Sequence, residues 1–566
     1  MRRSARSSRR RPRSDVLDPT AASRTRVARR RRATRDAHPA GVHHAGRRSG
    51  AARAGFFFCT ITTERSSMAE PLAAQSAPPS RSDDSVRPPR SARVDASAST
   101  APPAAPPDSP HSPRRRARAA RHVLKAAAFG ALGFAAFALA FPEHAPNALG
   151  AIVEDLTGAN PHPVALRRPA AEPLSAVAQL GRALFFDPSL SASGRQSCAS
   201  CHSPDRAYGP PNDLDVQLGG AALTRPGYRP PPSLMYLYRQ PNFSIGPDSS
   251  ENDDAASVAQ QAASAAGVVR ARKTAGAAAA PQLVPQGGMF WDGRADTLQQ
   301  QAFGPLMNPV EMANASTADV ARKLENARYA PQFRQLFGPR IFDDARLAVS
   351  EAMFAIARYQ VEDPSFHPYS SKYDRWLEGD ARLTRAELRG MRLFNDPAKA
   401  NCAGCHLSKP SPDGLPPMFT DFQYEALGVP RNRALAQNRN PAFHDLGICG
   451  PLRDDLKTQT QYCGMFATPS LRNVATRHVF FHNGVYHSLD QVLAFYNLRS
   501  VDPGKIYPRD ASGRVRQYDD IPSAYRANVD VADAPFDRKP GDAPAMTAQD
   551  MRDIVAFLNT LTDEKR

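Results

Sequence analysis

The stretch Cys198-Ala199-Ser200-Cys201-His202 has the spacing C-x-x-C-H, which is the pattern that attaches a c-type haem covalently. The two thiols become thioether bonds to the porphyrin, and the adjacent His ligates the iron. A single copy could also be a thioredoxin-like redox pair or half of a zinc site. A second copy, Cys402-Ala403-Gly404-Cys405-His406, occurs later in the chain. Two copies favour two covalently bound haem c groups, with His202 and His406 as iron ligands.

The sequence in front of each motif is repeated as well. Gly181-Arg-Ala-Leu-Phe-Phe-Asp-Pro188 precedes the first motif and Gly390-Met-Arg-Leu-Phe-Asn-Asp-Pro397 precedes the second, with five of eight positions identical. Such self-similarity indicates a duplicated domain. Apolar residues recur at helical spacing in several segments, whereas strand patterns are scarce. The sequence therefore predicts a mostly α fold.

Charge is distributed very unevenly along the chain. The 566 residues carry a net charge of +18, but residues 1–125 alone hold 28 Lys and Arg against 9 Asp and Glu, so the rest is almost neutral. Nucleic-acid binding would need a basic face on a folded domain. Segments such as Arg26-Val-Ala-Arg-Arg-Arg-Arg32 lack periodic apolar residues, so we predict a disordered leader at 1–125 and no nucleic-acid partner. Alternatively, translation starts at Met68 and the residues before it are an over-long reading frame.

An apolar segment at 126–142 follows the leader. It comes directly after the Arg-rich residues 114–121, as the h-region of a signal peptide follows its n-region. Ala138-Leu139-Ala140 offers a cleavage site. The alternative is an uncleaved membrane anchor, although the run is slightly short for a span of about 20 residues. Either interpretation predicts a periplasmic protein.

The cysteines outside the haem motifs agree with export. Cys59 lies in the leader, which leaves Cys449 and Cys463 as a pair in an oxidising compartment. We expect a disulfide between them, which would stabilise the fold mainly by restricting the unfolded chain. Two free buried thiols are the alternative.

Five further blocks belong with the two haem motifs. They are Leu190-Ser-Ala-Ser-Gly194, Phe290-Trp-Asp-Gly-Arg294, Asn308-Pro-Val-Glu-Met312, Thr468-Pro-Ser-Leu-Arg-Asn-Val474 and Phe481-His-Asn-Gly484. Together these blocks resemble the bacterial di-haem cytochrome c peroxidase family, closest to its MauG-type branch. The resemblance implies two cytochrome-c-like helical domains with one haem each. We place the N-terminal peroxidatic domain at 165–375, with a low-complexity insertion at about 244–283, and the C-terminal electron-relay domain at 376–566.

The resemblance also implies roles for single residues. The haem at His202 would react with hydrogen peroxide, and the haem at His406 would store or relay electrons. Glu311 matches the distal glutamate of the family and Gln301 its partner, and a haem that activates peroxide needs such an acid–base group. Trp291 matches the aromatic residue that couples the two haems.

Three departures from the classical members bear on the mechanism. No His occurs between His202 and His367, although the classical enzymes carry a blocking His in the region that corresponds to Leu218-Gly-Gly220. We therefore expect the first haem to be open to peroxide even when both irons are ferric. Tyr496 stands where the classical enzymes place a Met ligand, which is the MauG-type feature; the alternative is a core tyrosine. Ala400 replaces the Trp that relays oxidising equivalents to a protein substrate in the MauG type.

Two further expectations come from the same resemblance. Arg472 is expected to pair with a haem propionate, because a guanidinium suits a carboxylate. A calcium ion often lies between the domains in this family, but its Asn ligand is replaced within Arg229-Pro-Pro-Pro232. One calcium ion is therefore an open alternative rather than a firm expectation.

The sequence as a whole predicts an exported di-haem peroxidase. It would reduce hydrogen peroxide to water through high-valent haem iron, with electrons from a small periplasmic cytochrome c or cupredoxin. Two alternatives stay open. One is a MauG-like enzyme that oxidises a partner protein or an organic substrate, and the other is a di-haem electron carrier without catalysis.

Overall fold

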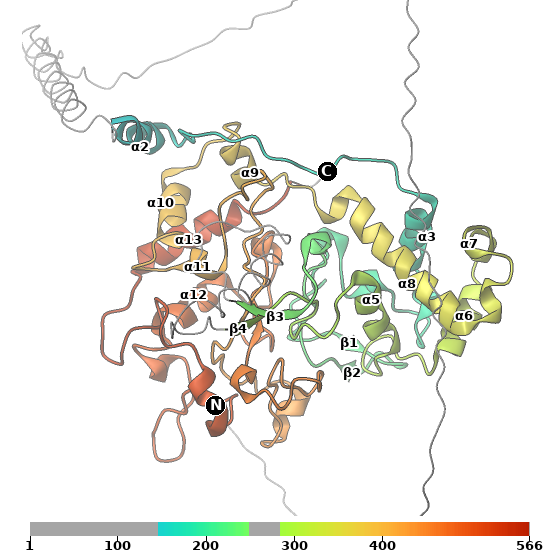
Figure 1. Ribbon diagram of the computed structural model, residues 1–566. Helices are drawn as coiled ribbons and strands as arrows, with labels where there is room; N and C mark the ends of the chain where they lie inside the picture. Colours follow the sequence, from blue (N-terminus) through green and yellow to red (C-terminus); the bar gives the residue numbers. More distant parts are fainter. Residues whose placement is uncertain (1–144, 248–282, 565–566) are drawn as a thin grey trace, which may run out of the picture. The chain divides into compact units, whose positions relative to one another are not determined.

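The repeated sequence in front of each haem motif forms the same arrangement twice (Figure 1). Helix α3 (Ala176–Phe185) crosses α8 (Ala345–Glu362), and α10 (Arg385–Phe394) crosses α13 (Ala548–Asn559). The computed structural model describes residues 145–247 and 283–564. The predicted leader at 1–125, the apolar segment at 126–142 and most of the predicted insertion lie outside the described residues.

The glycine of each repeat stands where the two helices cross. A Cβ on Gly181 would lie 1.8 Å from the carbonyl oxygen of Ala355, and a Cβ on Gly390 would lie 1.9 Å from that of Asp553. Only a glycine permits this close approach of two helix backbones. A glycine at the same position of each repeat therefore fixes the crossing of the helices in both halves.

The other elements are short. The remaining helices of the described part are α2 (Ala145–Thr157), α5 (Leu298–Met307), α6 (Thr317–Glu325), α7 (Ala330–Phe337), α9 (Lys372–Leu377), α11 (Cys402–Cys405) and α12 (Leu489–Leu498). Three antiparallel pairs of strands accompany them: β1 (Leu218–Gly219) with β2 (Arg225–Pro226), β3 (Ser244–Pro247) with β4 (Leu283–Gln286), and β5 (Tyr424–Glu425) with β6 (Phe466–Ala467). The mostly α prediction is confirmed.

Side-chain caps explain where the helices of the second half begin. Thr384 and Glu387 form a capping box at the start of α10, and Thr547 and Asp550 form another at the start of α13. Each box satisfies two backbone N–H groups that have no partner inside the helix. The chain is thereby fixed at the first turn of the helix that leads to the second haem motif.

Each helix crossing lies in its own hydrophobic cluster. Leu184 and Phe185 of α3 pack in the first cluster, and Phe394 of α10 and Phe557 of α13 pack in the second. Trp376 belongs to the second cluster, where its indole N–H donates to the carbonyl oxygen of Gly158. The described residues nevertheless all belong to one compact unit, so a domain boundary near residue 375 stays a prediction.

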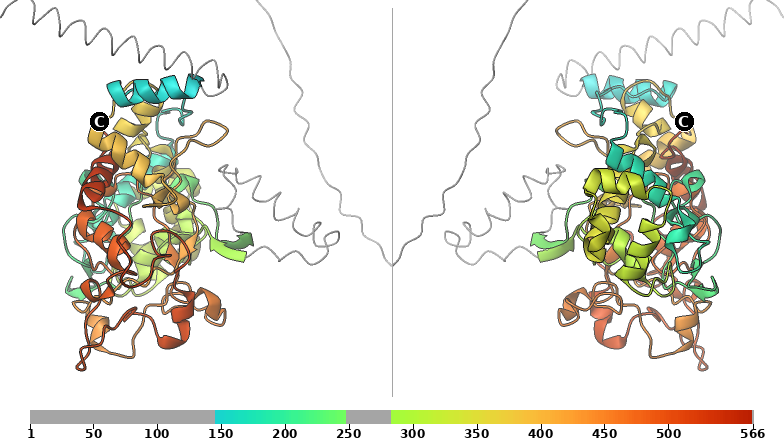
Figure 2. Two further views of the ribbon diagram at one scale, coloured as in Figure 1. Left: turned by 90° about the vertical axis from the view of Figure 1, so that its left-hand side faces the viewer. Right: turned by 90° about the vertical axis from the view of Figure 1, so that its right-hand side faces the viewer.

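The strand pair β3–β4 projects from the helices, as Figure 2 shows. Its strands lie at the two ends of the predicted low-complexity insertion, and Ser244 pairs with Gln286. The insertion thus begins and ends in one hairpin-like strand pair. Among the described residues, none of the helices combines the length and the apolar character needed to cross a bilayer.

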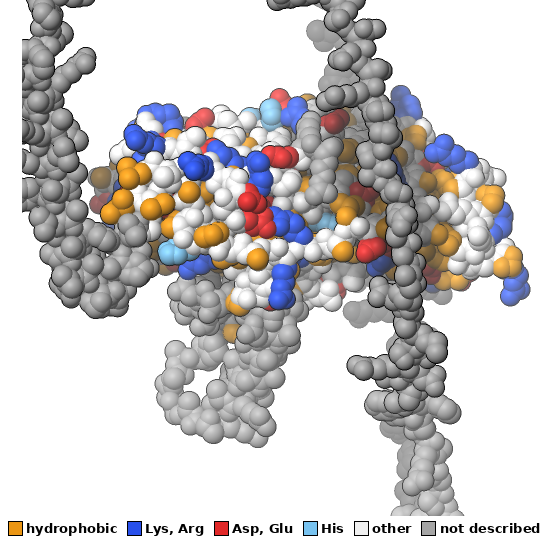
Figure 3. Space-filling view, turned by 90° about the horizontal axis from the view of Figure 1, so that it is seen from above, with side chains coloured by type: hydrophobic (Ala, Val, Ile, Leu, Met, Phe, Trp, Pro, Cys, Tyr) orange, Lys and Arg blue, Asp and Glu red, His pale blue; other side chains and the backbone are white. Residues whose placement is uncertain are grey.

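One face of the described part is drawn in Figure 3. Lys and Arg side chains lie scattered there among hydrophobic and uncharged ones, with a few acidic side chains between them. They do not gather into a single stripe on this face. The strong basic excess of the sequence lies in residues 1–125.

The helix crossing can be tested by adding one methyl group. We expect Gly390→Ala to lower the free energy of unfolding by about 1–3 kcal/mol or more, because the new Cβ has no space and overpacking forces the backbones apart. Chemical denaturation of the holoprotein measures this difference. Gly227→Ala is the control, because the nearest atom to its Cβ would lie 3.4 Å away. Equal stabilities of the two variants would contradict the proposed role of Gly390.

Candidate active site

The histidine of each haem motif is oriented by the backbone. His202 Nδ1 lies 3.1 Å from the carbonyl oxygen of Tyr208, and His406 Nδ1 lies 2.9 Å from that of Phe419. A carbonyl oxygen can only accept, so Nδ1 carries the proton and the Nε2 lone pair is left for a metal. Burial lowers the pKa of both histidines to about 4, so both imidazoles are neutral.

The thiols of the two motifs fit covalent attachment of a haem. Cys198 and Cys201 bracket one turn of 3-10 helix, and Cys402 and Cys405 are the ends of α11. None of these four cysteines takes part in a disulfide. Each motif therefore offers two unpaired thiols and a neutral imidazole on one turn of chain, which is the donor set of a haem c.

A cavity brings together predicted residues from both halves of the chain. His406 and Tyr496 line it from the C-terminal half, and Trp291 and Gln301 line it from the N-terminal half. The cavity also reaches Ala207, which lies close to the first motif in the sequence. The residues predicted to hold the second haem and to couple it to the first thus share one space.

Tyr496 faces this cavity from α12. Its pKa is raised by burial and further by the nearby sulfur atoms of Cys405 and Cys402, so the phenol is protonated while no cation is bound. Its ring stacks on Phe536, with 5.3 Å between the ring centroids. Within the described residues no group forms a hydrogen bond with its hydroxyl. The ring is thus held by packing, and the side chain lines the cavity.

Glu311 lies beside the first motif and not beside the second. It is close enough to Cys201 that its charge adds to burial in raising the pKa of that thiol to about 11. Burial raises the pKa of Glu311 itself, whereas the charge of Arg294 and a hydrogen bond from Asn308 oppose this rise. Asn308 Nδ2 donates to Glu311 Oε1 at 2.5 Å, which fixes the orientation of the carboxylate.

The segment Leu218–Gly220 packs directly against Glu311. The N–H of Gly220 donates to the carbonyl oxygen of Glu311 at 2.7 Å, and a Cβ on Gly219 would lie 2.3 Å from the carbonyl oxygen of Val310. No side chain fits at Gly219. The region in which the sequence predicts the absence of a blocking His is here a glycine contact with the backbone of Val310 and Glu311.

Trp291 bridges the two halves of the chain. Its indole N–H donates to the carbonyl oxygen of Pro230 at 3.0 Å, and its carbonyl oxygen accepts from the N–H of Ala467 in β6. The side chain of Trp291 is thus held by a segment that follows the first motif, and its backbone is held by a segment that follows the second. This position suits a residue that couples two haems.

A buried ion-pair network next to Trp291 could not be predicted from the sequence. The guanidinium of Arg229, 5% exposed, donates to Asp292 at 2.8 Å and in a bidentate manner to Asp445 at 2.8 Å. Asp292 also accepts from Arg294. Burial alone would raise the pKa of Asp445, but the charge and hydrogen bonds of Arg229 outweigh burial and hold that pKa below its ordinary value.

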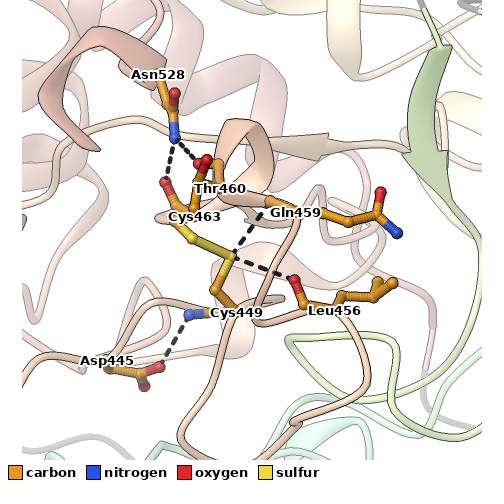
Figure 4. The surroundings of a disulfide bond; sticks show 8 residues. Asp445, Cys449, Leu456, Gln459, Thr460, Cys463 and Asn528 are labelled. Carbon is orange, nitrogen blue, oxygen red and sulfur yellow. Dashed lines mark hydrogen bonds between the residues drawn. A yellow bond between two sulfur atoms is a disulfide. The ribbon is translucent and has the colours of Figure 1, made fainter. Parts of the chain in front are cut away.

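The disulfide lies in the same region. Cys449 and Cys463 are bonded, which is the pairing expected from the sequence (Figure 4). Asn528, which lies outside the disulfide loop in the sequence, holds the loop by donating to the carbonyl oxygens of Thr460 and Cys463. Asp445, the partner of Arg229, stands just before this loop. The disulfide loop is thereby tied to Trp291 through Arg229 and Asp292.

Arg472 lines the cavity but already has a protein partner. Its guanidinium forms a buried bidentate pair with Asp374 at 2.8 and 2.9 Å, and its Nε donates to the carbonyl oxygen of Pro417. A role toward a propionate stays a prediction. Arg477, which the sequence did not single out, lines the same cavity and has no carboxylate partner among the described residues. Its guanidinium donates to the carbonyl oxygen of Pro231 at 3.2 Å. Burial lowers its pKa to about 10, and a guanidinium without a carboxylate partner suits a carboxylate of a cofactor.

No cluster of three or more acidic, His or Cys side chains that could hold a metal ion occurs in the described ranges. The space between Asp292 and Asp445, which could attract a cation, is filled by the guanidinium of Arg229. This arrangement bears on whether a calcium ion lies between the two halves, which the sequence left as an alternative.

Comparison with known proteins agrees with these features. The family model described as "Di-haem cytochrome c peroxidase" matches residues 175–382. The methylamine utilization protein MauG of Paracoccus denitrificans is 35% identical over 329 residues, which are 57% of this chain and 74% of that protein. The chain belongs to the di-haem cytochrome c peroxidase family. It is therefore an oxidoreductase of the peroxidase type, and its family implies haem cofactors.

Other relatives of this chain include proteins that are named as peroxidases. The cytochrome c551 peroxidase of Nitrosomonas europaea is 29% identical over 318 residues, which are 56% of this chain and 71% of that protein. The solved structure of the diheme peroxidase BthA from Burkholderia thailandensis superimposes with a TM-score of 0.59 and 38% identity. It covers 71% of this chain and 89% of that chain. The fold of the described part is the diheme peroxidase fold.

The network next to Trp291 yields a prediction on stability. We expect Arg229→Met to cost about 3–5 kcal/mol at neutral pH, because the carboxylate of Asp445 loses its cation and buried Asp292 keeps only Arg294. A carboxyl with a depressed pKa stabilises the fold above its unfolded pKa, and this contribution is lost as the pH falls. The difference from wild type should therefore shrink below about pH 4. Denaturation curves of both proteins across this range measure it.

The control for that experiment is an exposed pair. Lys505 pairs with Asp502 at 3.0 Å, and the two side chains are 66% and 45% exposed. Lys505→Met should cost less than about 1 kcal/mol, because exposed ion pairs contribute little. If both variants lost the same stability, the network around Arg229 would not have the strength that its burial implies.

Proposed function

We propose that this peroxidase reduces hydrogen peroxide to water at a haem c held by the His202 motif. A second haem c, held by the His406 motif, supplies the electrons, which arrive from a small periplasmic cytochrome c or cupredoxin. The observation that carries the proposal is the placement of Glu311 beside Cys201, with Trp291 lining the cavity of the second motif. Hydrogen peroxide takes up two electrons and two protons and yields two molecules of water.

The haem, when bound, supplies an iron coordination position for peroxide and the electrons that cleave the O–O bond. The protein supplies the proton transfers. Glu311 would accept a proton from one oxygen of the peroxide and deliver it to the other oxygen, which then leaves as water. Asn308 holds Glu311 Oε1 in place, and the Gly220 N–H holds the backbone of Glu311. Gln301 is the second polar group that we assign to the peroxide.

We assign Tyr496 as the second protein ligand of the C-terminal haem. Tyr496 lines the same cavity as His406. Iron binding would remove its proton, as cations do for coordinated acids. A phenolate is a hard anionic donor and favours ferric over ferrous iron, so this haem should have a low reduction potential.

The cation between Asp292 and Asp445 is, in our proposal, Arg229 itself. A guanidinium in a bidentate pair supplies the positive charge that a calcium ion would bring, and it leaves no space for one. Activity should then not depend on calcium. In this proposal Arg229 takes the place of the calcium ion, which the sequence left as an alternative.

Oxidation of a partner protein or an organic substrate is the second candidate function. Tyr496 and the 35% identity to a MauG protein favour it. Ala400 speaks against the Trp route to a protein substrate, so another route would be needed. Relatives that are named peroxidases favour catalysis over simple electron carriage.

The proposal is tested by Glu311→Gln. We expect peroxide turnover to fall by about a hundred- to ten-thousand-fold, because the amide cannot accept and return a proton. The wild-type rate should also fall on acidification, at a pH above that of an ordinary carboxyl, because burial raises the pKa of Glu311 and only its ionised form accepts the proton. Stopped-flow rates across the pH range measure both effects, and this acidic limb should be absent in the variant.

Glu325→Gln is the matched control for Glu311→Gln. Glu325 is an exposed carboxylate of α6 that pairs with Arg334. Its replacement should leave the turnover unchanged. Unchanged turnover in Glu311→Gln, with both haems attached, would overturn the assignment of Glu311.

A further inference from the structure

Tyr236 occupies a position that asparagine occupies in the other half of the chain. Pro232-Ser-Leu-Met-Tyr236 repeats Pro469-Ser-Leu-Arg-Asn473. Both final residues have a left-handed backbone, with φ of 65° for Tyr236 and 60° for Asn473. Asparagine is enriched in this conformation, whereas a bulky aromatic residue there is an outlier that costs free energy. Tyr236 thus keeps the backbone conformation of the repeat and differs from Asn473 in carrying a phenol.

The phenol of Tyr236 has a proton acceptor in direct contact. Its hydroxyl donates to Asp563 Oδ2 at 2.6 Å, and the same oxygen accepts from Asn473 Nδ2. Asp563 Oδ1 accepts from the N–H of Ser370. The ring of Tyr236 is 1% exposed, while Asp563 is only partly buried. A proton that leaves Tyr236 thus has a carboxylate to receive it, and that carboxylate has access to solvent.

Tyr236 also lines the cavity that contains Trp291 and His406. The guanidinium of Arg472 lies 4.9 Å from the centre of its ring. A fixed positive charge opposes the formation of a second one on the ring, so loss of an electron from Tyr236 requires that its proton leaves as well. The hydrogen bond to Asp563 meets this requirement.

Two further tyrosines continue from Tyr236 toward the surface. The ring of Tyr369 lies 4.7 Å from that of Tyr236, measured between centroids. The hydroxyls of Tyr369 and Tyr238 lie 2.8 Å apart, and Tyr238 is partly exposed beside His367. The three phenols form one continuous row from the cavity wall to a partly exposed ring.

We propose that Tyr236 is a redox-active tyrosine and that Tyr369 and Tyr238 carry its oxidising equivalent to the surface. The inference rests on the proposed function, because hydrogen peroxide is the oxidant. In the first step Tyr236 gives one electron to the haem pair that peroxide has oxidised, its O–H bond breaks, and the proton forms an O–H bond on Asp563. An electron-rich aromatic reductant then reduces the neutral tyrosyl radical. The electron passes through Tyr238 and Tyr369, and Asp563 returns the proton. This row offers a route out of the cavity that does not need an aromatic residue at Ala400.

The test is freeze-quench electron paramagnetic resonance of the diferric holoprotein mixed with hydrogen peroxide and no reductant. We expect an organic radical whose hyperfine pattern changes when the protein carries ring-deuterated tyrosine. The signal should be lost in Tyr236→Phe, which keeps the ring but has no phenol. Asp563→Asn should slow radical formation, and in the wild type D₂O should slow it, because a proton moves with the electron.

Controls separate this inference from the proposed function. Tyr228→Phe, a change at an exposed tyrosine outside the row, should keep the signal. Tyr238→Phe should keep the radical but lower the rate at which hydroquinone, used as the aromatic reductant, removes it. If the absorption spectrum responds to peroxide and Tyr236→Phe retains the tyrosyl signal, the inference is wrong. If the absorption spectrum of the wild type does not respond to peroxide at all, the proposed function is wrong.

Discussion

The ion pairs of Arg229 with Asp292 and Asp445 are the constraint on which the centre of this peroxidase depends. They join a segment after the first haem motif, the segment that carries Trp291, and the segment that leads into the disulfide loop. Buried charges are costly unless they are fully paired. The network therefore holds the three segments together next to Trp291, whose own hydrogen bonds to Pro230 and Ala467 join the same two halves.

The duplicated sequence explains how two haem sites arise from one structural plan. A glycine fixes each helix crossing, a backbone carbonyl orients each motif histidine, and a left-handed residue follows each Pro-Ser-Leu turn. In our proposal the two halves then differ in the residues that serve the cofactors. Glu311 is proposed to transfer protons in the first half, and Tyr496 is proposed to be an anionic ligand in the second half. A shared scaffold thus carries two sites with different chemistry.

Much of this arrangement could be predicted from the sequence, because local patterns determine it. The haem motifs, the capping boxes of α10 and α13 and the pairing of Cys449 with Cys463 all follow from residues near one another or from simple counting. The pair between Arg229 and Asp445 could not be predicted, since 216 residues separate its members and no local pattern marks either one. Arg477 was missed for the same reason: its unpaired charge becomes visible only when the cavity is known.

We propose that the first haem is open to peroxide without prior reduction, because Leu218–Gly220 offers no histidine that could block it. Rapid mixing of the diferric holoprotein with hydrogen peroxide, without a reductant, tests this directly. We expect an immediate shift of the Soret absorption band, at a rate proportional to the peroxide concentration. A spectrum that stays unchanged until one haem has been reduced would show that another residue caps the iron, and the proposal would be wrong.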